Sequence, residues 1–277
     1  RLKKWKNLNN LQISENIQME GFLTKILTEK KESVLQKRAK LPLSKLQEML
    51  KKVSPARNFK ESISKKSTFN IIGEIKKASP SAGIIRPLYD AGKLAKELAA
   101  GGVSAISVLT EEKHFHGDLF HLIRAYDSAP IPILRKDFII DEYQIFEARA
   151  YFADAVLLIA ELLSEQQLCD YLAVCKSIGL SALVELHNEN QIDKVIKANP
   201  DIIGINNRNL DDFSVDISST FKIKKKLPEG KIVVSESGIK TKYDIFKLKD
   251  AGINAALIGE TLMRAENIKS KLIELIM

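Results

Sequence analysis

The stretch FNIIGEIKKASPSAG, residues 69–83, opens with seven mostly apolar residues and continues with lysine, serine, proline and glycine. The apolar part predicts a strand buried on both faces, because a half-buried strand would alternate apolar and polar side chains. The polar part predicts a loop at the carboxyl end of that strand. This loop lacks the glycine-rich turn that follows the first strand of a dinucleotide-binding open sheet.

Seven further apolar runs follow the first along the chain. The eight predicted strands span residues 69–75, 103–109, 131–135, 154–160, 181–186, 201–206, 231–236 and 253–259. Longer, polar-faced segments between them predict helices over residues 90–101, 141–151, 164–178, 188–198, 216–226, 240–250 and 260–275. Strands that alternate with helices in this number predict an α/β fold, a (β/α)8 or TIM barrel over residues 69–277. A doubly wound open sheet is the alternative.

Residues 1–68 differ from the barrel sequence and predict a helical extension. Spaced apolar residues suit an amphipathic helix over residues 17–51, which Pro42 interrupts, with a second short helix over residues 43–52. The segment 54–68 is a polar connector, rich in turn formers. We expect the extension to pack on the barrel, so that the chain forms one structural domain.

The net charge of +8 originates in this extension. Residues 1–68 contain 17 Lys and Arg against 6 Asp and Glu, whereas the remainder contains 26 against 29. A basic arm could bind RNA, DNA or an anionic membrane, but no aromatic platform or recognition motif accompanies it. We therefore expect solvated helix faces and neither nucleic acid nor membrane as a partner; nucleic-acid binding is the competing class of function.

The chain is long enough for a large core and contains only two cysteines, Cys169 and Cys175, which cannot form a disulfide framework. Their spacing of six places them on different faces of a predicted helix and favours ordinary packing. No signal peptide and no apolar run of membrane-spanning length is present in the sequence. We expect a cytoplasmic monomer.

Polar side chains stand at the carboxyl ends of several predicted strands, where a TIM barrel holds its active site. They are Glu74, Lys76, Lys136, Glu185, Asn206, Arg208, Glu236 and Ser237. Residues two apart in a strand point to the same side, so Glu74 and Lys76 can both face the barrel mouth. A structural ion pair would explain one such pair, but two lysines and three glutamates on one rim predict perturbed pKa values and acid-base catalysis. Lys136 and Glu185 are the foremost candidates, and Glu74 is expected to hold a lysine in place.

Turns that contain glycine follow the last two predicted strands, in SESGI at 235–239 and IGETLM at 258–263. Gly238 and Gly259 would offer backbone N–H groups where this fold often binds phosphate, and the final helix would aim its N-terminus at the anion. Ser79, in the first loop, can add a hydroxyl. Plain turn geometry is the alternative explanation for each glycine.

The HFH sequence at 114–116 could suggest a metal site. No carboxylate or cysteine set at ligand spacing accompanies it, so we expect no metal. Phe115 and Phe138 lie near strand ends and are candidate walls for an aromatic ligand, with a place in the core as the alternative.

Six stretches occur in an order typical of one known family. They are IIGEIKKASPSAGII at 71–85, SVLTEEKHFHG at 107–117, PILRKDFIID at 132–141, ALVELHNE at 182–189, IGINNRNL at 203–210 and VSESGI at 234–239. They resemble the motifs of the indole-3-glycerol-phosphate synthase family, over about residues 20–277. The resemblance implies a barrel preceded by helices, no cofactor, and a single-function form without the isomerase domain that is fused to some relatives.

The resemblance implies closure of 1-(2-carboxyphenylamino)-1-deoxyribulose 5-phosphate to indole-3-glycerol phosphate, with loss of carbon dioxide and water. Lys136 corresponds to the family's catalytic general acid and Glu185 to the glutamate that assists proton removal. Lys76 corresponds to a lysine that binds substrate and can also serve as an acid. The other matches are Glu74 and Asn206 as orienting groups, Phe115, Arg208, Glu236 and Ser237 in the substrate pocket, and Ser79, Gly238, Gly259 and Glu260 at the phosphate.

The chain departs from the family pattern at Ala82 and Ala78, where relatives carry a basic residue, so one contact to phosphate or carboxylate is expected to be weaker. A phosphosugar isomerase on the same barrel is the alternative enzyme. The related isomerase relies on a Cys/Asp pair, and neither cysteine of this chain lies at a predicted strand end.

Overall fold

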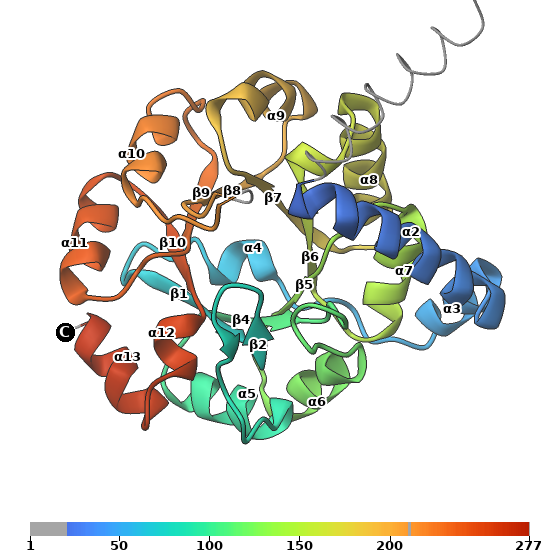
Figure 1. The fold of residues 1–277 in the computed structure, drawn as a ribbon, viewed down its shortest axis with the longest axis horizontal. Coiled ribbons are helices and arrows are strands. Elements are labelled where there is room, and N and C mark those ends of the chain that lie inside the picture. The colour runs from blue at the N-terminus through green and yellow to red at the C-terminus, as the bar shows by residue number, and fades with distance from the viewer. Residues whose placement is uncertain (1–20, 210–211, 277) are drawn as a thin grey trace, which may run out of the picture.

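The computed structural model describes residues 21–209 and 212–276, and its centre is a closed barrel of parallel strands (Figure 1). In barrel order the strands are β1 (Asn70–Ile75), β10 (Ala255–Ile258), β9 (Ile232–Glu236), β8 (Ile202–Asn206), β7 (Ser181–Leu186), β6 (Ala155–Ile159), β5 (Ile133–Lys136) and β4 (Ala105–Leu109). β1 pairs with β10 on one side and β4 on the other, so the barrel has no free edge. The predicted barrel and its eight strands are confirmed, and the open-sheet alternative is wrong.

A ring of helices covers the outside of the barrel (Figure 1). Its members are α5 (Ala91–Ala100), α6 (Phe120–Ser128), α7 (Glu142–Ala150), α8 (Glu165–Ser177), α9 (Ile192–Ala198), α10 (Ser218–Lys224), α11 (Lys242–Asp250), α12 (Glu260–Met263) and α13 (Ile268–Ile276). Side chains of Asp90, Asp141, Ser164 and Thr241 cap α5, α7, α8 and α11 by accepting backbone N–H groups that a helix leaves unpaired at its start.

The structure differs from the predicted elements in three places. α6 lies outside the predicted helices; it buries only Leu122 and Ala125. The predicted last helix is divided into α12 and α13. In the first loop, β2 (Ala78–Ser79) and β3 (Gly83–Ile84) form a small antiparallel pair that no sequence pattern indicated.

Apolar side chains from all eight strands fill the barrel interior. Leu134 of β5 and Leu183 of β7 belong to this interior cluster, and each lies two residues before a charged residue of the same strand. Since side chains two apart share one side of a strand, the inward-facing rows end in charged groups at the mouth of the barrel. At the amino end of the strands, two residues are fully buried in the same cluster: Phe59 of α4 (Phe59–Ser62) and Ile63, which follows this helix.

The N-terminal extension forms α2 (Phe22–Lys40) and α3 (Leu43–Leu50), and Pro42 lies between them as predicted. The predicted helical residues 17–20 lie outside the described part of the chain. Leu46 of α3 and Val34 of α2 are buried with Tyr143 of α7, whose hydroxyl donates to the carbonyl of Leu41 at 2.9 Å. The two helices therefore pack on the outside of the barrel next to α7 (Figure 1).

Cations of the extension bind acceptors on the barrel. Ion pairs join Lys30 to Asp137, Lys37 to Glu112, Arg38 to Asp141 and Lys60 to Asp201. Arg57 donates to the backbone carbonyls of Tyr126, Ala129 and Ile131 and stacks on the Tyr126 ring, 3.8 Å from its centroid. Some cations of the extension thus bind it to the barrel, whose sequence contains slightly more acidic than basic residues.

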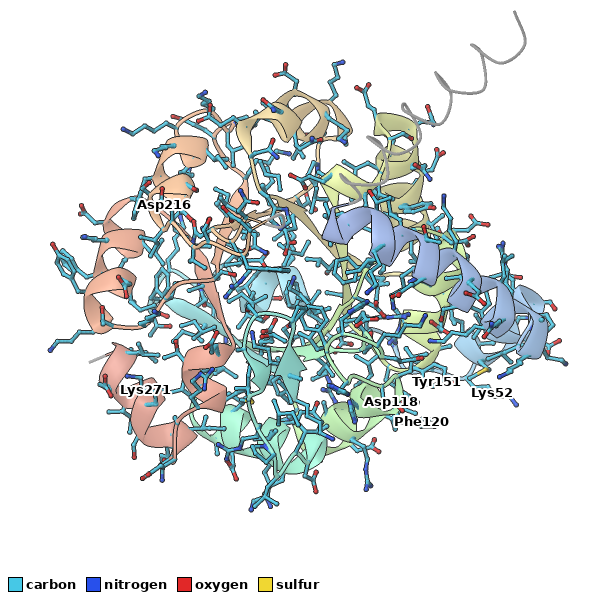
Figure 2. The ribbon with its side chains drawn as sticks, in the orientation of Figure 1. Lys52, Asp118, Phe120, Tyr151, Asp216 and Lys271 are labelled. Carbon is cyan, nitrogen blue, oxygen red and sulfur yellow. The ribbon has the colours of Figure 1, made fainter. Side chains whose placement is uncertain are left out.

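The outer surface carries charged side chains around the ring of helices, including the exposed Lys52 and Asp216 (Figure 2). Apolar side chains on this surface are scattered, and one of them, Phe120, contacts the Tyr151 ring edge-on at 5.8 Å (Figure 2). Among the described residues, no helix is both long and apolar enough to span a lipid bilayer.

Candidate active site

A cavity of about 920 Å³ opens at the carboxyl ends of the barrel strands. Every site residue singled out from the sequence lines it: Glu74, Lys76, Ser79, Phe115, Lys136, Phe138, Glu185, Asn206, Arg208, Glu236, Ser237, Gly238, Gly259 and Glu260. These residues come from the ends of five barrel strands, β1, β5, β7, β8 and β9, and from segments that follow these strands, β4 or β10. The barrel therefore gathers side chains that are up to 186 residues apart in the chain around one space.

Lys136 lies between two glutamates at this cavity. Its Nζ is 2.8 Å from Oε2 of Glu185 and 3.7 Å from Oε2 of Glu236, and both carboxyl groups are almost fully buried. Burial opposes the charge on Lys136, but the carboxylates of Glu185, Glu236 and Glu74 outweigh it and raise the pKa of the lysine. Lys136 therefore enters a reaction as an ammonium group, which can donate a proton.

The two glutamates differ in protonation. Burial opposes the charge on Glu185, but the Lys136 ammonium and His187 lower the pKa of this carboxyl group to about 2. Burial and the charge on Glu185 raise the pKa of Glu236 well above its usual range. Two carboxylates so close to each other cannot both ionise easily, so Glu185 takes the charge and Glu236 favours its protonated form.

The second lysine is paired in the same way. Nζ of Lys76 lies 2.8 Å from Oε1 of Glu74, at the end of β1, which confirms that the two side chains point to the same side. Gly259 leaves the space for this pair, because a Cβ atom there would stand 2.2 Å from Oε1 of Glu74. Gly204 of β8 does the same for Glu236, whose Oε1 would be 2.2 Å from a Cβ at that position.

Polar contacts connect the loops after β8 and β9. Oδ1 of Asn206 accepts the Ser237 hydroxyl at 2.8 Å and the Arg208 backbone N–H at 3.1 Å. Ser237 has a φ of 66°, a conformation that costs a non-glycine residue about 1–3 kcal/mol. The next residue, Gly238, has a φ of 82°, which glycine adopts freely. This turn brings the Ser237 side chain to the cavity wall.

The turns proposed for phosphate lie together in the described structure, but the adjacent helix is shorter than predicted. α12 has four residues, with Gly259 at its N-cap and Glu260 as its first residue. Glu260 accepts a hydrogen bond from Arg264 at 2.9 Å, and its other oxygen lies 3.9 Å from Arg208. A single helical turn contributes less dipole than the long helix expected there.

One wall of the cavity is aromatic. The rings of Phe115 and Phe138 lie 6.3 Å apart, centroid to centroid, at an angle of 45°. Phe138 is buried and Phe115 half-buried, and both pack against the interior cluster that includes Ile26 of α2. Since α2 contributes to this cluster, the N-terminal extension helps to form the wall of the site.

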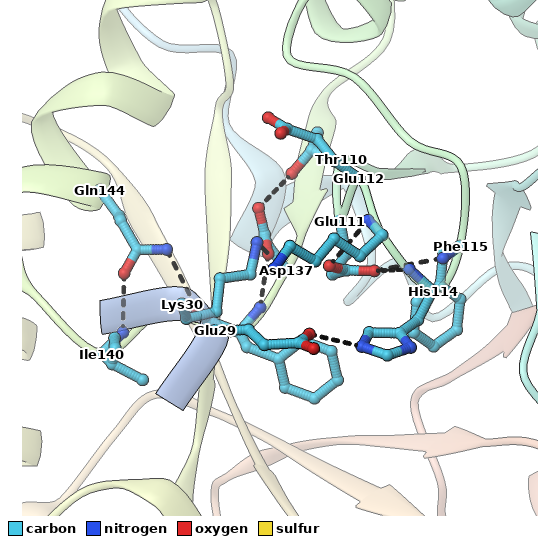
Figure 3. A network of polar contacts seen from close by, with 12 residues as sticks. Glu29, Lys30, Thr110, Glu111, Glu112, His114, Phe115, Asp137, Ile140 and Gln144 are labelled. Carbon is cyan, nitrogen blue, oxygen red and sulfur yellow. Dashed lines mark hydrogen bonds and ion pairs between the residues drawn. The ribbon is translucent and has the colours of Figure 1, made fainter. Parts of the chain in front are cut away.

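Sequence patterns missed the charged network behind this wall, and Figure 3 shows three of its members, Lys30, Thr110 and Asp137. Arg135 is fully buried and contacts Asp137 at 3.0 Å and Glu147 at 2.9 Å, while Asp137 also accepts the Thr110 hydroxyl at 2.7 Å. Lys30 of α2 completes the network, and its ammonium and the guanidinium of Arg135 overcome burial to lower the pKa of Asp137. The sequence RKD at 135–137 is a signal, because three consecutive charges at a strand end must point to opposite faces.

The HFH segment has a structural explanation (Figure 3). The Glu111 carboxylate accepts the backbone N–H groups of Lys113, His114 and Phe115, which folds the loop and brings Phe115 to the cavity. His114 pairs with Glu29 of α2 at 2.7 Å. Within residues 21–209 and 212–276, no three His, Cys, Asp or Glu side chains are grouped to hold a metal ion.

The cysteines lie on α8, away from the strand ends. Cys175 is buried in the layer between barrel and helices, as ordinary packing predicts, whereas Cys169 is only half-buried. Neither cysteine lines the cavity, so the Cys/Asp chemistry of the isomerase alternative has no cysteine at this site.

Several solved structures share the fold of this chain. N-acetylmannosamine-6-phosphate 2-epimerase from Clostridium perfringens superposes with a TM-score of 0.60 at 15% identity, covering 79% of this chain and 96% of that one. 3-Hexulose-6-phosphate synthase gives 0.59 at 14% identity, covering 74% and 97%. At these identities the likeness shows the fold alone. Fold and site together define a TIM-barrel enzyme with a buried lysine–glutamate centre.

Sequence comparison specifies the family. The family model of indole-3-glycerol phosphate synthase matches residues 23–275. The indole-3-glycerol phosphate synthase of Alkaliphilus metalliredigens is 43% identical, covering 92% of this chain and 97% of its own length, and that of Desulfotalea psychrophila is 45% identical, covering 93% and 99%. This chain belongs to the indole-3-glycerol-phosphate synthase family, as its sequence motifs predicted.

Proposed function

We propose that this enzyme converts 1-(2-carboxyphenylamino)-1-deoxyribulose 5-phosphate to indole-3-glycerol phosphate, with release of carbon dioxide and water, in tryptophan biosynthesis. The reaction makes it a carboxy-lyase. The observation that carries the proposal is Lys136, held between Glu185 and Glu236 in a cavity that aromatic side chains and glycine turns also line. A cavity of about 920 Å³ falls within the range of roughly 300–1,000 Å³ that is usual for small-molecule sites.

Lys136 acts as the general acid of ring closure. When the aromatic carbon attacks the substrate ketone, negative charge develops on the ketone oxygen, and a proton from Nζ of Lys136 neutralises it. The raised pKa of Lys136 ensures that the proton is present before the reaction. Glu185 holds the ammonium at 2.8 Å and so fixes the direction of the transfer. Loss of carbon dioxide then restores the aromatic ring.

Glu185 acts as the base of the dehydration. It is ionised, buried and within reach of the same space as Lys136, so it can accept the proton that leaves as the double bond of the indole forms. Lys76, oriented by Glu74, binds the substrate and serves as the second acid for the departing hydroxyl. Asn206 orients the polar side chains of the rim through Ser237.

Binding is divided between the two walls. Phe115 and Phe138 receive the anthranilate ring, and Arg208, Glu236 and Ser237 contact the polar middle of the substrate. The phosphate occupies the side formed by Ser79, Gly238, Gly259 and Glu260. Because an ionised Glu260 side chain would repel phosphate, its backbone N–H is the group that faces the anion, while its carboxylate orients Arg208.

We further propose that the enzyme works as a cytoplasmic monomer without cofactor, metal, nucleic acid or membrane. The cations of the extension that pair with the barrel support a structural use of this charge. We also propose that residues 1–68 and the barrel, residues 69–277, form one domain, because α2 and α3 share buried clusters with barrel residues.

The test is formation of indole-3-glycerol phosphate by the purified protein, compared with Lys136→Ala, Glu185→Gln and the exposed control Lys225→Ala. The first two variants should fold and lose about 10²-fold or more in kcat, the amount typical of a positioned acid or base. Lys225→Ala should match the parent. A parent without activity would overturn the function, and an active Lys136→Ala or Glu185→Gln would overturn the assigned roles.

A further inference from the structure

His187 lies next to Glu185, outside the set of residues that the sequence motifs assign to the reaction. It follows β7 directly, and its side chain is 5% exposed. Its Nε2 is 3.2 Å from Oε1 of Glu185, the carboxylate oxygen that does not contact Lys136. The two atoms are in ion-pair range but not aligned as a hydrogen bond, so a small rotation of either group would complete one.

The other face of the imidazole is fixed by Glu161, from the short 3-10 helix η1 (Ala160–Leu162) after β6. Oε2 of Glu161 lies 3.2 Å from Nδ1 of His187, and its Oε1 accepts the His187 backbone N–H at 2.8 Å. One carboxylate thus holds both the ring and the backbone of the same residue. The result is a chain of three side chains, Glu161, His187 and Glu185, that ends at the catalytic cavity.

A carboxylate at each ring nitrogen restricts what the imidazole can do. A neutral imidazole has one N–H and can donate to only one carboxylate, whereas the doubly protonated ring donates to both. After Lys136, His187 is the neighbour that lowers the pKa of Glu185 most. Without His187, Oε1 of Glu185 would be buried beside Glu236 and would lose the imidazole that faces it.

We propose that His187 is a positioning residue for Glu185: the ring, held by Glu161, orients the Glu185 carboxylate toward the substrate and keeps it ionised as a base. The proposal rests on the proposed role of Glu185 in the reaction. The groups that face Glu185 from the surrounding elements are Lys136 of β5, Glu236 of β9 and His187 itself, with Glu74 and Glu161 beyond them. Two of these groups, Lys136 and His187, lower the pKa of Glu185 most, and His187 is the one that can be replaced without removing the proposed acid.

Two substitutions of His187 distinguish a role in positioning Glu185 from a role in anchoring the loop after β7 to Glu161. Asparagine places its amide nitrogen near the position of Nδ1, so His187→Asn retains the contact with Glu161 and loses the one with Glu185. Glutamine places its nitrogen near Nε2, so His187→Gln retains the contact with Glu185 and loses the anchor. Glu189→Gln is the matched control, two residues along in the 3-10 helix η2 (Glu189–Gln191), where Glu189 forms an exposed pair with Lys226.

The experiment measures kcat, KM, the pH profile of kcat/KM and the thermal midpoint of each variant. We expect His187→Asn to lower kcat by about 10- to 100-fold with little change in KM, as is typical when the partner of a functional group is removed. Its acid limb should move to higher pH, because Glu185 loses a neighbour that lowers its pKa. His187→Gln should retain more of kcat than His187→Asn, and Glu189→Gln should behave like the parent.

If His187→Gln loses more of kcat than His187→Asn, His187 serves to anchor the loop and the proposal is overturned. The proposal is also overturned if both variants lose kcat equally, in parallel with a lower thermal midpoint and without a shift of the acid limb. If His187→Asn does not fold, Glu161→Gln replaces it and should give the same shift with a smaller loss. Glu185→Gln is measured in parallel: an active Glu185→Gln defeats the assigned base, whereas an inactive Glu185→Gln beside an unaltered His187→Asn defeats only the role of His187.

Discussion

Nζ of Lys30 lies 2.6 Å from Oδ1 of Asp137, although the two residues are more than 100 positions apart, and both side chains are buried. Asp137 immediately follows Lys136 at the end of β5. The pair therefore ties the N-terminal helix α2 to the strand that presents the proposed general acid. It also gives the buried carboxylate a second cation beside Arg135.

Replacing Lys30 by methionine should destabilise the fold while Arg135 and Thr110 continue to hold Asp137. We expect a loss of about 1–3 kcal/mol in the free energy of unfolding at pH 7, the usual cost of removing one partner from a buried polar group. Denaturant unfolding measures it, with the exposed neighbour in Lys31→Met as the control. A Lys30→Met protein as stable as the parent would contradict the structural role of the pair.

The same pair gives the stability a defined pH dependence. Lys30 and Arg135 lower the pKa of Asp137 in the folded state, so the ionised carboxylate stabilises the fold above the ordinary aspartate value of about 4. That contribution is lost as the pH falls below this value toward the folded-state pKa. The stability difference between the parent and Lys30→Met should therefore be largest near neutral pH and shrink at about pH 3.

Alanine at Gly204 should act on catalysis more than on folding. A Cβ atom there would meet Oε1 of Glu236, the free end of a flexible side chain, which can move aside. Since a displacement of about 1 Å can cost on the order of 10²-fold in rate, kcat should fall by about 10-fold or more. The matched control is Gly73→Ala, whose Cβ would meet Leu98 on the outer face of β1. It should lose about 1–3 kcal/mol of stability and keep its kcat. Equal kcat values in the two variants would show that a Cβ atom at position 204 does not disturb catalysis through Glu236.

Glu236→Gln should shift the alkaline limb of the activity profile. At alkaline pH Glu236 is ionised despite its raised pKa, and its charge then helps to raise the pKa of Lys136, so Lys136 should lose its proton at lower pH in the variant. The variant should therefore lose activity on the alkaline side at a pH where the parent is still active. The pH profile of kcat/KM tests this, with Glu189→Gln as the remote control; an unchanged alkaline limb would mean that Lys136 is not the titrating acid.

Arg57→Ala should loosen the connector between the extension and the barrel. The guanidinium donates to three backbone carbonyls and stacks on Tyr126, so its removal leaves partly buried acceptors without these donors. We expect a loss of about 2 kcal/mol in the free energy of unfolding, against no change for the exposed Lys52→Ala. Chemical denaturation of both variants checks it. A similarly small effect in both variants would mean that Arg57 is a solvated charge, as the sequence suggested, and does not hold the connector on the barrel.

Local patterns determined the barrel and the membership of its rim. Buried runs such as IIGEI and DAVLLIA have no polar face, which in a chain of alternating helices leaves only a covered parallel sheet. Charged residues that end these runs, such as Lys136 and Glu185, were identifiable because parallel strands place their carboxyl ends at one side. The helix α6 was not predicted, although it is longer than α9 and α10, which were.

Only the tertiary structure decided which groups touch. Lys30 and Arg57 look in the sequence like ordinary surface charges, because their partners lie tens to more than a hundred residues away and a local pattern has no record of them. His187 looks like a loop histidine, although Glu185 is only two residues away, because the contact with Glu161 that holds its ring spans 26 residues. Gly204 and Gly259 likewise resemble plain strand and turn residues until Glu236 and Glu74 occupy the space that a Cβ would fill. The sequence by itself determined the fold and the chemical inventory of the site; burial and distance, which set pKa values and orientation, exist only after the barrel closes.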